Sequence, residues 1–335
     1  MKIRRQSLPS GQLELAVLQH GHWHPLSTLI AASPQAVSPS LACQDDLIAI
    51  LGGGDELLNE VRALLDQTAG QEAESPPETD HPLPAPFSPR SIRDFMLYEK
   101  HVIAAGRGYA RRFLPKAWPV LNAYEKIFRK PHPKLRPKPL WYKHPIYYMG
   151  SHINILGHGD IVPWPPYSSA LDYELELGIV VTKPLYNATP EEALQAIGGF
   201  TILNDFSARD CQLAEMTSGF GPVKAKNFAN SIGPCVVETQ DLLARADNLD
   251  VNVRINGQVV AESNTAGMHY SLGEMVAYAS LGERVVPGEL MGTGTIPGCC
   301  ALENEHWLQP DDTIELTIEG IGSLTNRISH LPQDE

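Results

Sequence analysis

The chain has 335 residues, 43% of them hydrophobic, which is ordinary for a soluble globular protein with one large and one smaller domain. Its formal net charge of −13 argues against a nucleic acid or an anionic membrane surface as the main partner. The five cysteines include no CxxC pair, and no apolar run approaches the ~20 residues of a transmembrane helix. We therefore expect a soluble, unprocessed protein in a reducing, cytoplasmic setting.

The chain changes composition at residues 68–90, which are rich in proline, glutamate and serine. A segment of this kind buries little apolar area and tends to be extended, so we expect a linker there. This division predicts a small N-terminal β-rich domain over residues 1–80 and a larger domain over residues 81–335.

Two elements are predicted within the N-terminal part. Alternating apolar residues and a turn near His20 and Gly21 predict a β-hairpin over residues 11–26. Apolar residues at helical spacing then predict a helix over residues 55–67, with Asp55 as its N-terminal cap.

Residues 92–102 place apolar side chains at helical spacing, which predicts a helix at the start of the larger domain. On such a helix Asp94 and His101 are seven residues apart and share one face. Both side chains are therefore candidates for a common site, although an isolated histidine more often packs against neighbours or caps a helix.

Residues 107–143 carry eleven lysines and arginines against a single acid, Glu125. In a chain this acidic, such segregation indicates either a mobile, proline-rich basic flap that attracts an anionic substrate or a plain solvated surface loop.

Acidic and apolar residues alternate strictly in the first part of segment 171–181, which is predicted to be a strand. Because strand side chains alternate between faces, Asp172, Glu174 and Glu176 share one face. Such a face is either solvated or a site for a hard cation, since like charges repel unless water or a metal compensates them.

Many strands and few helices follow, so we expect a mainly β, α+β fold with a mixed, mainly antiparallel sheet. In chain order the further predicted elements are a capped helix over 189–197, a strand over 200–204 that ends at Asp205, a type I′ hairpin over 251–261, a capped helix over 271–281, a turn with exposed hydroxyls at 292–295 and two strands over 313–327.

Four ordered motifs of the larger domain resemble those of the fumarylacetoacetate hydrolase family. They are the acidic strand motif ELE at 174–176, NDFSARDCQ at 204–212, KNF at 226–228 and the turn GTIPG at 294–298. The long-chain members also carry an Asp-Phe pair with a histidine seven residues after the aspartate, as Asp94 and His101 are placed here. The resemblance covers about residues 90–330.

The resemblance implies a β-roll catalytic domain, a small SH3-like N-terminal domain and a homodimer. It also implies four metal ligands, Asp94, Glu174, Glu176 and Asp205, with Asp172 as a neighbour. Four carboxylates without a cysteine suit Mg²⁺, Mn²⁺ or Ca²⁺ rather than zinc.

Catalytic roles follow from the same resemblance. His101 would activate water as a general base, oriented by Glu303, for which Glu305 is the alternative. Lys226 and Gln212 would stabilise the developing negative charge.

Substrate contacts are also implied, with Arg209, Tyr148 and Thr295 positioning carboxylates or carbonyls of a small anionic oxo acid. Two departures from the family pattern, Met96 and the segment 225–229, indicate a substrate other than fumarylacetoacetate itself. The basic flap is expected to set that specificity.

Three functions are consistent with these residues. The first is hydrolysis of a carbon–carbon bond in a β-diketo or acylpyruvate-type oxo acid, with His101 activating water and the metal stabilising the enolate. The second is decarboxylation or keto–enol tautomerisation of an oxo acid at the same metal site. The third is a non-catalytic protein that binds oxo acids.

Overall fold

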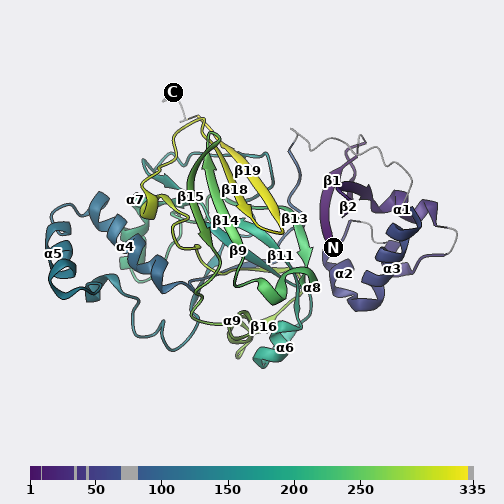
Figure 1. Cartoon of the computed structure of the whole chain (residues 1–335), viewed down its shortest axis with the longest axis horizontal. Helices are drawn as coiled ribbons and strands as arrows, with labels where there is room; N and C mark the ends of the chain where they lie inside the picture. Colours follow the sequence, from purple (N-terminus) through teal and green to yellow (C-terminus); the bar gives the residue numbers. More distant parts are fainter. Residues whose placement is uncertain (9, 34–35, 43–44, 69–81, 331–335) are drawn as a thin grey trace.

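The computed structural model describes residues 1–8, 10–33, 36–42, 45–68 and 82–330 (Figure 1). The predicted linker therefore lies mostly outside the described residues. No helix in the described ranges is long and apolar enough to cross a membrane.

Strands outnumber helices in the described chain. They are β1 (Lys2–Ser7), β2 (Leu13–Gln19), β3 (His22–Pro25), β4 (Ser91–Phe95), β5 (Tyr147–Gly150), β6 (Ile155–Leu156), β7 (Ile161–Val162), β8 (Leu171–Asp172), β9 (Leu175–Val181), β10 (Leu185–Tyr186), β11 (Ile197–Asn204), β12 (Ser207–Ala208), β13 (Asn230–Glu238), β14 (Asp250–Ile255), β15 (Gln258–Asn264), β16 (Arg284–Val285), β17 (Glu289–Gly292), β18 (Thr313–Ile318) and β19 (Gly322–Ile328).

The helices are mostly short. They are α1 (Leu26–Ala32), α2 (Leu47–Gly52), α3 (Gly54–Thr68), α4 (Glu99–Phe113), α5 (Trp118–Phe128), α6 (Pro190–Leu194), α7 (Arg209–Thr217), α8 (Thr239–Leu242), α9 (Leu272–Ala279) and α10 (Ala301–Asn304), with 3₁₀ turns η1 (Pro39–Ala42), η2 (Pro133–Leu135) and η3 (Leu243–Arg245).

Two sheets carry the fold within the described residues. The larger has the order β3-β2-β1-β13-β11-β9-β17-β4-β5, with β6 pairing with β13, and the smaller has the order β15-β14-β18-β19-β7. Most pairings are antiparallel, whereas β17 with β4, β13 with β6 and β19 with β7 are parallel. The predicted sheet-rich, mainly antiparallel α+β architecture is confirmed.

Both faces of the large sheet are covered. One core lies between the two sheets and includes Leu177 and Ile179 of β9. A second core packs the opposite face, including Val180 of β9, against α1–α3, which lie at the right of Figure 1. Asp172 lies in β8, Glu174 lies between β8 and β9, and Glu176 lies in β9 on the same face as Val180. All three acids are buried, so the solvated alternative for them is wrong.

The N-terminal part does not form a closed barrel within the described residues. Strand β1 pairs with β2 on one side and with β13 on the other, so β1–β3 extend the large sheet. A strand with both edges occupied cannot close a separate barrel, and the SH3-like domain is not confirmed. The division at residues 80 and 81 stays a prediction about folding units.

The single helix predicted over residues 92–102 is wrong. Asp94 lies in β4, where it pairs with Gly292 of β17 and Tyr148 of β5, whereas His101 lies in α4. The apolar residues of β4 have helical spacing, but β4 pairs with a strand on each edge. This pairing determines its conformation, because tertiary contacts override a weak local pattern.

Other local predictions have mixed outcomes. Both hairpins are confirmed, as β2–β3 and β14–β15, and both capping boxes form, at Thr189 and Ser271. Asp55 is not an N-cap, because α3 already begins at Gly54. The hydroxyls predicted to be exposed at 292–295 are buried, since this turn lies against β4 and β9.

The basic segment 107–143 is helical over much of its length rather than a solvated loop. It contains the end of α4, all of α5 and η2. Figure 1 shows α5 at the end of the molecule opposite to α1–α3. In α5 none of the side chains is buried.

Candidate active site with a buried carboxylate cluster

Three buried carboxylates from neighbouring elements of the large sheet converge at one point. They belong to Asp94 of β4, Glu176 of β9 and Asp205, which directly follows β11, and their ligand atoms lie within 4.8 Å of one another. Gly292 of β17 lies between β4 and β9. A Cβ at this glycine would lie 2.3 Å from Oε2 of Glu176 and 2.7 Å from Oδ1 of Asp94. Because Gly292 has no side chain, there is room at this point for the carboxylates to meet.

Electrostatics make this cluster costly without a cation. Two effects raise the pKa of Asp94 well above its usual range: burial, which is the larger, and repulsion from Asp205. The pKa of Glu176 is also raised well above its usual range, mainly by burial and next by repulsion from Asp94. Oδ1 of Asp94 and Oδ1 of Asp205 have no hydrogen-bond partner in the described part of the chain. An oxygen-only donor set with unpartnered buried atoms fits a hard divalent cation.

A buried lysine stands beside the cluster. The ammonium of Lys226 donates to carboxylate oxygens of Glu174 and Asp205, and its side chain is almost fully buried. Burial opposes the charge, but Asp205 and Glu174 outweigh it and raise the pKa of Lys226. Tyr148 donates its hydroxyl to Oδ2 of Asp205 at 2.7 Å. The predicted residues Lys226 and Tyr148 thus lie at the carboxylates.

Glu174 has cationic partners for both carboxylate oxygens. Arg209 donates to Oε1 at 2.6 Å, and Lys226 donates to Oε2. Burial alone would raise the pKa of Glu174, but these two cations lower it below its usual range. Glu174 therefore lies next to the three clustered carboxylates with its charge already balanced.

Arg209 is buried and has few donors left for a substrate. Its Nε donates to Asp172 at 2.8 Å, and its Nη1 donates to Gln212 at 2.9 Å. Asp172 also accepts the backbone N–H groups of Ala301 at 2.6 Å and Leu302 at 3.2 Å. Asp172 thereby connects Arg209 to the first residues of α10.

Helix α10 supplies the partner of the predicted base. Nδ1 of His101 lies 2.6 Å from Oε1 of Glu303, and the histidine is 3% exposed. Nε2 of the same ring lies 4.0 Å from Oε1 of Glu174, on the side of the carboxylates. The alternative partner, Glu305, is exposed and forms an ion pair with Arg111 at 3.1 Å.

The remaining predicted residue is buried. Thr295 has no exposed surface, and its Oγ1 has no hydrogen-bond partner in the described residues. The backbone N–H of the preceding Gly294 donates to Oε2 of Glu176 at 3.1 Å. The GTIPG turn is thereby attached to the carboxylate cluster.

Three residues of the site were not predicted as functional. Asp172 belongs to the alternating acidic segment but was predicted to be a neighbour of the metal ligands and not a ligand. Its contact with the start of α10 could not be predicted, because those residues lie far along the chain. Gly292 carries no local signal beyond being a glycine. Cys300, whose Sγ lies 3.7 Å from Oε1 of Glu303, has no sequence signal that links it to His101.

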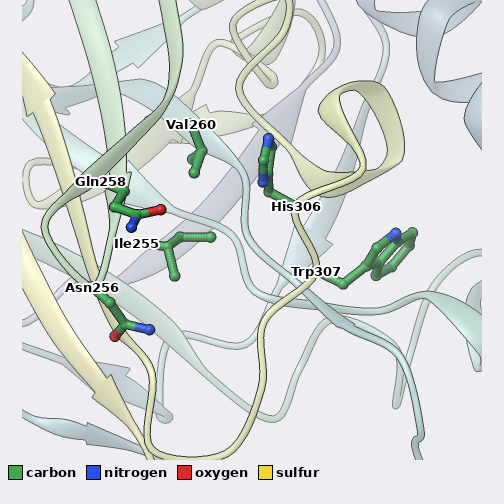
Figure 2. A pocket seen from close by; sticks show the side chains of 6 residues that line it. All are labelled: Ile255, Asn256, Gln258, Val260, His306 and Trp307. Atoms are coloured by element: carbon green, nitrogen blue, oxygen red, sulfur yellow. The ribbon is translucent and has the colours of Figure 1, made fainter.

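Two cavities flank the loop after α10 without reaching the carboxylates. The cavity in Figure 2, of about 210 Å³, lies between this loop and the β14–β15 hairpin and is lined by Ile255, Asn256, Gln258, Val260, His306 and Trp307. A cavity of about 310 Å³ on the other side is lined by Arg112, Trp164, Ser168, Ser169, Ala170, Trp307, Leu308, Gln309 and Pro310. None of the predicted site residues lines either cavity, so they carry no part of the site argued above.

Comparison with known families gives one matching family model and a set of similar proteins. The family model described as fumarylacetoacetate (FAA) hydrolase C-terminal matches residues 116–329. A fumarylacetoacetate hydrolase domain-containing protein 2 homolog from Dictyostelium discoideum is 33% identical over 195 residues, which cover 56% of this chain and 64% of that protein.

Other curated relatives include the oxaloacetate tautomerase YisK of Bacillus subtilis, 31% identical over 56% of this chain and 62% of its own length. The human mitochondrial oxaloacetate tautomerase FAHD2A is 28% identical over 72% of this chain and 81% of its own length. The chain thus spans less than two thirds of the Dictyostelium and Bacillus relatives.

Solved structures share the fold over most of the chain. A fumarylacetoacetate hydrolase from Exiguobacterium antarcticum has a TM-score of 0.68 at 21% identity and covers 98% of this chain and 99% of its own. A maleylpyruvate hydrolase from Sphingobium sp. SYK-6 has a TM-score of 0.65 at 17% identity with the same coverage.

Proposed function

The chain belongs to the fumarylacetoacetate hydrolase family, and from that premise we propose that it is a divalent-metal-dependent hydrolase. Its substrate is a β-diketo or acylpyruvate-type oxo acid, in which it cleaves a carbon–carbon bond. The observation that carries this proposal is the pair formed by the buried His101 and the half-buried Glu303, in which Nε2 of His101 faces the carboxylates. A histidine oriented by a carboxylate is an arrangement suited to activating water.

Asp94, Glu176 and Asp205 would hold the metal, with Glu174 as the predicted fourth ligand. Mg²⁺, Mn²⁺ or Ca²⁺ suits this oxygen donor set. When bound, such an ion supplies Lewis-acid stabilisation of negative charge on the two oxygens of a 1,3-dioxo unit.

His101 moves the proton in the hydrolytic step. The carboxylate of Glu303 accepts the Nδ1–H, which leaves Nε2 free to take a proton from water. The oxygen of that water bonds to the carbonyl carbon, and the adjacent carbon–carbon bond breaks. Its electron pair leaves with the enolate fragment, which then takes up a proton.

The other polar residues hold the site together or contact the substrate. Lys226 places a buried positive charge where negative charge develops. Arg209, whose donors are largely used by Asp172, Glu174 and Gln212, orients Glu174 instead of binding substrate directly. Tyr148 orients Asp205, and the unpartnered Oγ1 of Thr295 is left for a substrate carbonyl or carboxylate.

A second candidate is keto–enol tautomerisation or decarboxylation of an oxo acid. It is favoured by the similarity to the Bacillus and human proteins named as oxaloacetate tautomerases. Tautomerisation requires His101 to move a proton between carbon and oxygen but does not require water to attack a carbon. The two functions therefore differ in their products.

Product analysis distinguishes the candidates. Purified protein with Mg²⁺ or Mn²⁺ is incubated with an acylpyruvate and, separately, with enol-oxaloacetate. Hydrolysis yields pyruvate and a carboxylic acid, tautomerisation yields only the keto form, and decarboxylation releases carbon dioxide. We expect hydrolysis, with a loss of about 10²-fold or more in His101→Asn.

Three results contradict parts of the proposal. Full activity after rigorous removal of metal rules out the metal role. Turnover of enol-oxaloacetate without any hydrolysis of the acylpyruvate means that the protein is a tautomerase and not a hydrolase. Tight binding without turnover across a panel of oxo acids supports the non-catalytic binding protein instead.

A further inference from the structure

A cysteine lies beside the histidine and glutamate of the proposed active site. Nδ1 or Nε2 of His101, Sγ of Cys300 and a carboxylate oxygen of Glu303 lie within 4.8 Å of one another. Oε1 of Glu303 is 2.6 Å from Nδ1 of His101 and 3.7 Å from the Sγ atom. His101 and Cys300 are buried and Glu303 is half-buried, so three chemically different donors lie close together.

This donor set differs from that of the carboxylate cluster. Imidazole, thiolate and carboxylate together are ligands of Zn²⁺, whereas oxygen atoms alone suit harder cations. In tetrahedral zinc sites the metal lies about 2.0–2.3 Å from each donor. Donors already within 4.8 Å of one another need only small side-chain movements to reach such a geometry.

Rigid elements hold the donors in place. His101 lies in the first turn of α4, and Cys300 and Glu303 belong to the N-cap and body of α10. Asp172 fixes the start of α10 by accepting two of its backbone N–H groups. The neighbouring Cys299 packs in the core between the two sheets, so consecutive cysteines have different surroundings.

We propose that His101, Cys300 and Glu303 form a second metal site, for a thiophilic divalent ion such as Zn²⁺, and that its occupation inhibits the enzyme. The metal takes the place between Nδ1 and Glu303, so Glu303 no longer supports a positive charge on the imidazole. The ring then becomes a poor proton acceptor at Nε2. The inhibition rests on the proposed function of His101, whereas metal binding does not.

Cobalt provides a direct test of the binding. The protein is kept in excess Mg²⁺, which competes for the oxygen-only cluster, and is titrated with Co²⁺. We expect sulfur-to-cobalt charge-transfer absorption that saturates at one ion per chain. Cys300→Ser should abolish it, while the matched control Cys299→Ser should retain it, because only the first removes a donor.

Zinc inhibition provides the second readout. Each variant is compared with its own zinc-free rate, and we expect the half-inhibiting Zn²⁺ concentration to rise at least about tenfold in Cys300→Ser but not in Cys299→Ser. Cys300→Ala repeats the measurement should the serine variant fail to fold, as judged by circular dichroism.

The outcomes are separable. Absence of the cobalt band in the wild type, or its persistence in both Cys300 variants, overturns the site whatever the enzyme does. A band that depends on Cys300, in a protein that shows no hydrolysis, supports the site and contradicts only the proposed function.

Discussion

Asp172, Glu174 and Glu176 come from one alternating acidic run, yet each has different partners. Asp172 anchors α10 and Arg209, Glu174 is balanced by Arg209 and Lys226, and Glu176 joins the cluster with two aspartates. The same residue chemistry thus has three consequences, because the cations and amides around each carboxylate differ.

Metal affinity separates these roles. We expect Glu176→Gln to weaken Mg²⁺ binding by at least about tenfold, since it removes a charged member of the three-carboxylate cluster. Glu174→Gln should weaken it less, and Asp172→Asn least, because the side chain of Asp172 contacts α10 and Arg209. Titration calorimetry measures all three, and an Asp172→Asn loss equal to that of Glu176→Gln contradicts this order.

A half-buried histidine, His158, predicts a pH effect on stability. Nδ1 of His158 lies 3.2 Å from the backbone N–H of Thr325, and burial lowers the pKa of His158 below 6.5, although the Ser323 carbonyl opposes this. The unfolded chain then binds a proton at a pH where the folded chain does not. Stability is therefore complete above pH 6.5 and decreases as the pH falls from there toward the folded pKa.

Urea unfolding at about pH 7.5 and about pH 5.5 measures this effect. His158→Asn, which retains an acceptor for Thr325 but does not titrate, should lose less stability than the wild type between these pH values. An equal loss in both proteins means that other groups cause the acid sensitivity.

At the scale of elements, the contact between α4 and α10 brings His101 to Glu303. A Cβ at Gly108 of α4 would lie 1.6 Å from the carbonyl oxygen of Leu302, so only glycine permits this approach. Gly106 of the same helix faces a flexible side-chain atom of Leu135 at 3.3 Å. The two glycines form a matched pair for testing the contact.

We expect Gly108→Ala to push α10 away from α4, which would destabilise the protein by about 1–3 kcal/mol through overpacking. Displacing Glu303 from His101 by about 1 Å should lower the rate by roughly 10²-fold. Gly106→Ala should remain near wild type in both respects. Thermal unfolding and steady-state kinetics provide the measurements, and equal activity of the two variants means that this contact does not position the pair.

At the scale of the whole molecule, the large sheet joins the N-terminal part to the rest. Strand β1 pairs with β13, and α1–α3 cover the face of the sheet that includes Val180, Ile232 and Leu290. Arg62 of α3 also pairs with Glu238 of β13 at 2.5 Å. Separating the two parts would expose an apolar sheet face and an unpaired strand edge.

We therefore expect one cooperative unfolding transition by calorimetry instead of two. A chain that begins at residue 82 should aggregate or melt well below the full-length protein. Two resolved transitions, or a stable shortened chain, would support the predicted boundary at residues 80 and 81 as a division between independent folding units. Homodimer formation stays a prediction, which sedimentation on the full-length chain can measure.

Local chemistry by itself determined much of the outline. The Asn256-Gly257 turn and the capping boxes at Thr189 and Ser271 depend only on residues a few positions apart, so they could be predicted. The oxygen-rich set of metal ligands could also be predicted from the sequence, because the acids occur in recognisable motifs and a carboxylate suits a hard cation in any fold.

Tertiary structure decided the rest. Asp94 lies in a strand because β17 and β5 pair with it, and His101 meets Glu303 across 202 positions of the chain. Cys300 joins them only because α10 packs against α4. Pairing, close packing and the removal of water depend on which distant segments cover a residue, and no local pattern contains that information.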